Sequence, residues 1–153
     1  MITVLIVVAG ITGTALMTAF VYLVSQITGK QLKVIHVLGT MLTGQTTPGK
    51  NISSNPSAFM IGIVVHYLVG ILFAFIYHWL WSIGLGRPDI LNGLLFGFIN
   101  GFIASAGWRF FFAIHQNPPL IDLKNFLLVI FLAHIVFGIG VVLAYNVFQH
   151  FLY

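Results

Sequence analysis

Residues 62–78 read GIVVHYLVGILFAFIYH and residues 93–109 read GLLFGFINGFIASAGWR, and these two stretches decide the fold. In each, a small or polar side chain recurs at every fourth position of an apolar run. The recurring residues are Gly62, His66, Gly70, Ala74 and His78, then Gly93, Gly97, Gly101, Ser105 and Arg109. Because lipid gives helices no hydrophobic reason to associate, small residues at this spacing let membrane helices pack backbone to backbone. We therefore expect two transmembrane helices that are closely packed.

A short turn at residues 84–88 joins the two stretches and makes them antiparallel neighbours. Reflected about this turn, the two series pair residue by residue, with Gly62 opposite Arg109 and His66 opposite Ser105. The sequence therefore predicts a tight hairpin between these helices. The residues expected to form the helix contact are Gly62, Gly70, Ala74, Gly93, Gly97 and Gly101.

Composition requires that lipid is the solvent. Of the 153 residues, 59% are hydrophobic and only 5% are charged, whereas about a quarter of the residues of a soluble domain are charged. Four apolar stretches exceed the roughly 20 residues that cross a bilayer, at about residues 2–24, 58–81, 90–115 and 124–150. A backbone in lipid must satisfy its own hydrogen bonds, which favours helices. We expect an all-α polytopic membrane protein, with residues 1–153 forming one antiparallel bundle of four transmembrane helices.

The first connection is the only long one, and its sequence changes character halfway. Residues 33–43 place apolar side chains on one helical face and Lys33, His36, Thr40 and Thr43 on the other. This pattern is typical of a short amphipathic helix that lies in the membrane interface. Residues 44–56 read GQTTPGKNISSNP and are predicted to be a loop.

Basic residues gather on one side of the predicted bundle. Five of the six lie in or beside the first and third connections: Lys30, Lys33, Lys50, Arg109 and Lys124. The positive-inside rule places that side in the cytoplasm, so both termini are expected outside the cytoplasmic (inner) membrane. The positive charge then serves contact with anionic membrane lipids. No basic, aromatic-rich surface for nucleic acid is present.

Polar residues are expected at one depth inside the bundle. His66 lies about nine residues from the predicted cytoplasmic boundary, and reflection about residues 117–121 places Ser105 level with His134. Ionisable side chains inside a membrane are costly and face the bundle interior, where they have partners. The residues assigned to this buried polar layer are Thr14, Thr18, His66, Asn100, Ser105 and His134.

Several chemistries fit two buried histidines. His66 and His134 can ligate the iron of haem b, with Arg109 near a propionate. They can also titrate in a proton or small-solute pathway. A metal site is not expected, because two histidines without a carboxylate bind zinc or iron poorly. In the simplest alternative, the histidines only donate hydrogen bonds across the helix contact, with no cofactor.

Catalytic motifs are missing from the sequence. There is no cysteine, no HExxH or GxSxG motif, no Gly-rich phosphate loop, and no acidic residue to orient a Ser105–His66 pair. No internal repeat is strong enough to predict an inverted-repeat transporter. The leading hypothesis is a non-enzymatic accessory or interaction subunit without a catalytic residue, which packs against a copy of itself or against a larger membrane protein.

Overall fold

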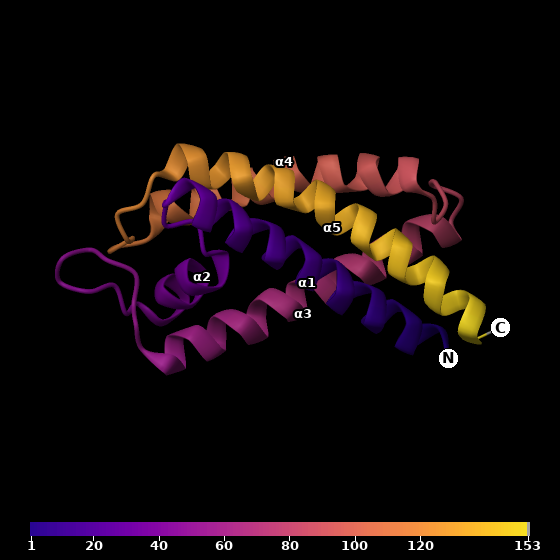
Figure 1. Ribbon diagram of the computed structural model, residues 1–153, viewed down its shortest axis with the longest axis horizontal. Coiled ribbons are helices and arrows are strands. Elements are labelled where there is room, and N and C mark those ends of the chain that lie inside the picture. The colour runs from indigo at the N-terminus through magenta and orange to yellow at the C-terminus, as the bar shows by residue number, and fades with distance from the viewer. Residues whose placement is uncertain (153) are drawn as a thin grey trace.

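Five α-helices make up the described chain, and four of them are long and apolar enough to cross a membrane (Figure 1). In this computed structural model, residues 1–152 are described. The helices are α1 (Ile2–Thr28), α2 (Val34–Thr43), α3 (Pro56–Ser82), α4 (Ile90–Ile114) and α5 (Leu123–Leu152). Within residues 1–152 there is no strand. The predicted all-helical membrane bundle is confirmed.

Local sequence sets where the last three helices begin. The Asn55 side chain accepts a hydrogen bond from the backbone N–H two residues on, and Pro56 occupies the first helical position. Asp89 and Asp122 each accept one from the backbone N–H three residues on. These bonds satisfy N–H groups that have no partner within the helix. Proline at the first position costs nothing, because its missing N–H would be unpaired there.

The helices run between two ends of the molecule (Figure 1). Both termini and the turn at residues 83–89 lie at one end, which we call the terminal end. Residues 29–55 and 115–122 lie at the other end, which we call the loop end. The helices α3 and α5 therefore run in the same direction, from the loop end to the terminal end.

Helix α1 lies at the centre of the packing. It packs along α3 and along α5, while α4 packs on α5 and α2 packs on α3. The expected hairpin between α3 and α4 is wrong, because these two helices do not pack along each other. They touch through long side chains toward the terminal end, where Tyr77 and Trp81 of α3 meet the ring of Phe96.

The small residues of α3 face α1 and α2 instead of α4. A Cβ on Gly70 would overlap the Thr14 side chain of α1, and a Cβ on Gly62 would overlap the Ile35 carbonyl of α2. Ala74 lies in the same α1 contact, because a Cβ on Gly10 would stand 3.1 Å from the Ala74 Cβ.

The small residues of α4 face α5. A Cβ on Gly93 would stand 2.9 Å from the Gly138 carbonyl oxygen, and one on Gly97 would stand 2.6 Å from the carbonyl oxygen of His134. A Cβ on Gly101 would stand 2.7 Å from the Phe131 ring. The small residues of α3 and of α4 therefore meet helices outside the predicted hairpin.

Candidate functional site

A cavity of about 250 Å³ lies between α3 and α4, in the half of the bundle nearer the loop end. All five helices contribute to its lining, which is mostly apolar. Two histidines are the ionisable side chains in this lining: His66 of α3 and His134 of α5. Among the lining residues, Val69 of α3 and Gly107 of α4 are exposed. The cavity therefore opens between α3 and α4, which do not pack along each other.

His66 is held by a threonine of α1. Its side chain is buried, and its Nε2 lies 2.9 Å from the Thr18 hydroxyl. That hydroxyl lies 2.7 Å from the Thr14 carbonyl, which only accepts. A hydroxyl has one hydrogen, and Thr18 donates it to the carbonyl. The hydroxyl oxygen therefore accepts a hydrogen bond from the N–H of Nε2. The neutral His66 ring therefore carries its proton on Nε2 and a lone pair on Nδ1.

His134 is held by its own helix. Its Nδ1 lies 2.8 Å from the carbonyl oxygen of Ile130, four residues earlier. A carbonyl only accepts, so Nδ1 carries the proton of the neutral ring. The other nitrogen, Nε2, has a free lone pair and forms no hydrogen bond with any described residue.

Aromatic rings form much of the rest of the lining. Phe73 comes from α3, Trp108 and Phe111 from α4, and Phe137 from α5. The indole of Trp108 is held edge-on by the buried ring of Phe126, with ring centroids 5.0 Å apart. Aromatic side chains present flat apolar surfaces with a preferred stacking geometry. The cavity is therefore suited to a flat apolar group.

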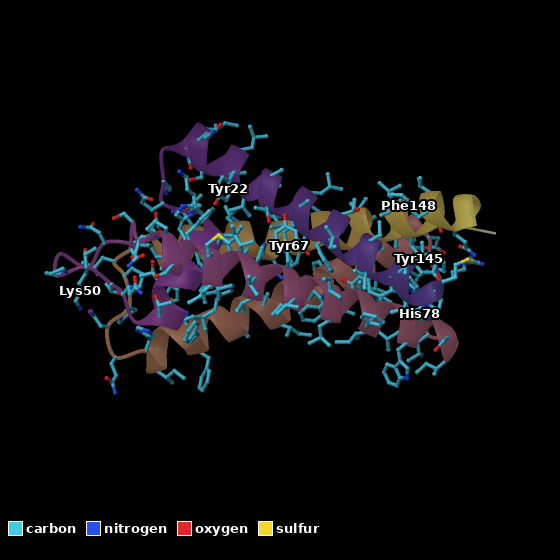
Figure 2. All side chains as sticks on the ribbon, turned by 90° about the horizontal axis from the view of Figure 1, so that it is seen from below. Tyr22, Lys50, Tyr67, His78, Tyr145 and Phe148 are labelled. Atoms are coloured by element: carbon cyan, nitrogen blue, oxygen red, sulfur yellow. The ribbon has the colours of Figure 1, made fainter. Side chains whose placement is uncertain are left out.

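Toward the terminal end, large side chains close the bundle. The Asn100 amide donates a hydrogen bond to the buried Tyr77 hydroxyl at 3.0 Å. His78 and Tyr145 lie side by side there (Figure 2), with 3.2 Å between Nδ1 and the hydroxyl oxygen. These contacts join α3 to α4 and α3 to α5 where the cavity is absent. The contacts between α3 and α4 are therefore made by long side chains on this side of the cavity.

The residues expected in one polar layer therefore lie in different places. The structure brings Thr18, His66 and His134 to the cavity or directly behind it. Thr14 is buried, donates to the Gly10 carbonyl and packs on α3.

Two other members of the expected layer have different partners. Asn100 bonds to Tyr77 nearer the terminal end. The expected contact of Ser105 with His66 is wrong, because Ser105 donates to the Leu127 carbonyl of α5. The physical reason is the pairing of α4 with α5 instead of α3.

The structure brings together only some of the residues of the expected haem arrangement. His66 and His134 do line one cavity. However, the Nε2 atom of His66 already forms a hydrogen bond with Thr18. Arg109 is exposed and is not among the lining residues. Among the described residues, no group of three or more His, Cys, Asp or Glu side chains is arranged to hold a metal ion.

A short repeated spacing marks the cavity, and the sequence analysis missed it. The spacing His-x3-Gly-x6-Tyr occurs as His66, Gly70 and Tyr77 in α3 and again as His134, Gly138 and Tyr145 in α5. In both helices the glycine lies in close contact with a neighbouring helix, and the tyrosine is buried. Since α3 and α5 run in the same direction, the repeat places the two histidines at equivalent positions.

A second, more polar hollow lies at the loop end. Lys33, His36, Ser53 and Ser54 are among its lining residues. Burial and the positive charge of Lys33 lower the pKa of His36. Lys33 has no carboxylate partner, because Asp122 pairs with Lys30 and Asp89 pairs with Arg87, and the chain has no other acidic side chain. This hollow is suited to contact with anionic groups.

No family model, curated protein or solved structure matches this chain. The class of protein therefore follows from the fold alone. The chain is a small integral membrane protein with four apolar helices and one short amphipathic helix.

Proposed function

We propose that this protein binds an apolar small molecule from the bilayer in the cavity between α3 and α4, without catalysing a reaction. The observation that carries this proposal is the partly open cavity of about 250 Å³ with two histidines in an apolar lining. Small-molecule sites are typically concave and apolar, with a few polar groups that orient the ligand. An accessory role fits such a site, because binding needs no catalytic group.

The charge distribution supports a binding role over catalysis. Activation of a nucleophile by histidine usually requires a third group that orients the base. Both acidic side chains of the chain lie outside the four long apolar spans, and both pair with basic residues there. The cavity histidines are bonded to a hydroxyl and to a carbonyl instead.

Cavity filling tests the proposal. Gly107 lines the cavity and has no atom within 4 Å of an added Cβ, whereas its neighbour Ala106 is exposed and does not line it. In lipid nanodiscs, the wild type should show saturable binding of a single-ring apolar compound such as 4-propylphenol. Gly107→Phe should abolish this binding, and Ala106→Phe should retain it. Binding that survives unchanged in Gly107→Phe would contradict the proposal.

Haem b is a second ligand that the paired histidines favour. If the protein carries haem, the preparation should show a Soret absorption band that is lost in His66→Ala and in His134→Ala. A control substitution outside the cavity, His78→Ala, should keep the band. A colourless preparation after growth with added haem precursor would exclude this candidate.

We also propose that the protein acts beside a second copy or a larger membrane protein. In α3 and α4, 22% of the most apolar segment is buried inside the bundle, against 44% in α1 and 50% in α5. The wide outer surface of α3 and α4 is therefore available to a partner. Mass measurement and co-purification in mild detergent should show an oligomer or a bound protein. A strict monomer with no co-purifying protein would contradict this role.

The orientation that we propose places the loop end in the cytoplasm and both termini outside the inner membrane. Lys30, Lys33 and Lys50 of the loop end support it through the positive-inside rule. Because the chain contains no cysteine, single cysteines can report the orientation. A membrane-impermeant thiol reagent should label Leu85→Cys in intact cells and leave Thr47→Cys unlabelled. The reverse pattern would overturn the orientation.

A further inference from the structure

We infer that the ligand of this cavity is an apolar ring that bears a hydroxyl group, and that the hydroxyl donates its hydrogen bond to Nε2 of His134. This inference rests on the proposed binding function. The chemical class it names is a phenol or a ring alcohol, as opposed to an ether, a ketone or a plain hydrocarbon. This chemical class follows from the hydrogen-bonding atoms of the cavity lining that have no partner within the described residues.

The histidines offer acceptors and no spare donors. The neutral ring of His134 donates its N–H to the Ile130 carbonyl, and the neutral ring of His66 donates its N–H to the Thr18 hydroxyl. The Thr18 hydroxyl donates its own hydrogen to the Thr14 carbonyl. The atoms that remain are two imidazole lone pairs, of which Nε2 of His134 has no partner in the described part of the chain. A ligand must donate to satisfy them.

A hydroxyl group meets this requirement better than other oxygen groups. An ether or ketone oxygen only accepts, so it would face the imidazole lone pair with a lone pair of its own. The indole N–H of Trp108 is the one remaining side-chain N–H of the lining. A hydroxyl can donate to histidine and also accept from such an indole. Sites built around a ligand hydroxyl reject analogues that lack it, because the polar group of the site is then left unpaired.

Shape favours a single ring. An apolar cavity of about 150 Å³ is enough to bind benzene. The volume of about 250 Å³ therefore has room for one ring with a substituent. Phe73, Trp108, Phe111 and Phe137 offer flat surfaces against which a ring packs in stacked or edge-to-face geometry.

A matched pair of ligands tests this inference. The purified full chain is placed in lipid nanodiscs, and saturable binding of 4-propylphenol is compared with that of its methyl ether, 4-propylanisole. Uptake by empty nanodiscs of the same lipid is subtracted for each compound. A net hydrogen bond of ordinary strength corresponds to about a tenfold difference in affinity. We expect the phenol to bind about tenfold more tightly than the ether.

The variant His134→Phe locates the preference. Since the imidazole bonds only within its own helix, its removal leaves no other side chain without a partner. The preference for the phenol should fall below about threefold in this variant. The control His78→Phe removes a histidine of α3 that is not among the cavity residues, and the tenfold preference should persist there.

The possible outcomes separate the two proposals. Equal affinity of the two compounds for the wild type overturns the hydroxyl inference and leaves the binding function standing. An unchanged preference in His134→Phe, in protein that retains its helical circular dichroism, also overturns the inference. If neither compound binds beyond the empty nanodisc, the proposed binding function itself is wrong.

Discussion

Glycines in this bundle differ sharply in what surrounds their Cα atoms. A Cβ on Gly138 would overlap the Gly93 carbonyl and stand 2.9 Å from the Gly97 nitrogen. These are backbone atoms, which cannot rotate away, so α4 and α5 would have to separate. We expect Gly138→Ala to lower the free energy of unfolding by about 1–3 kcal/mol, the usual cost of overpacking.

The matched control for this substitution is Gly107→Ala. An added Cβ there meets nothing within 4 Å, and alanine favours a helix over glycine. Unfolding in mixed micelles, followed by circular dichroism, should show unchanged or slightly raised stability for Gly107→Ala. Equal losses in the two variants would show that the α4–α5 contact is not as close as described.

His36 makes stability depend on pH. Burial and the charge of Lys33 lower the pKa of His36 below its ordinary value of about 6.5. The folded state therefore binds the proton less readily than the unfolded state. The His36 contribution to stability is present above about pH 6.5 and is lost as the pH falls toward the lowered pKa.

The substitution His36→Gln should reduce this dependence. The difference in melting temperature between pH 7.5 and pH 5.5 is expected to be smaller in the variant than in the wild type. His36 also contacts Tyr22 and Phe59, so the comparison uses the difference between the two pH values and not the melting temperature itself. An equal difference in both proteins would contradict the assigned role.

At the scale of helices, the two glycine series belong to two separate contacts. Gly70 packs on α1, and Gly97 packs on α5. Substitutions at distant sites without shared partners are usually additive within about 0.5 kcal/mol. We expect the destabilisation of the double variant Gly70→Ala and Gly97→Ala to equal the sum of the two single losses. A coupling energy above about 1 kcal/mol, measured by a double-mutant cycle, would point to one shared contact.

Local features of the sequence predicted the helices well. The four spans follow from hydropathy and length, and Asn55, Asp89 and Asp122 mark helix starts by hydrogen bonds to nearby backbone N–H groups. Such features depend on neighbours within a few residues.

The choice of partner helix could not be predicted in the same way. The spacing of Gly70 and Gly97 shows which side of each helix is small, but not which other small side it meets. Thr14 of α1 and Gly138 of α5 proved to be those partners. Because α4 pairs with α5, Ser105 bonds to that helix and not to His66, and the cavity lies between α3 and α4 because these two helices do not pair.

At the scale of the whole molecule, α1 and α5 form the centre of the bundle. A Cβ on Gly140 of α5 would stand 3.0 Å from the Gly13 Cα of α1, so these two helices are in close contact. Helix α3 packs on the α1 side of this pair, and α4 packs on α5. The cavity lies between the two outer helices, α3 and α4, which do not pack along each other.

The opening between α3 and α4 has a consequence for how the site fills. A molecule that enters there arrives from among the acyl chains, so the rate at which the site fills follows its mole fraction in the membrane. At one free concentration of 4-propylphenol in water, the site should therefore fill faster in nanodiscs of a lipid into which the compound partitions more strongly. A filling rate that follows only the aqueous concentration would mean that the molecule enters from water.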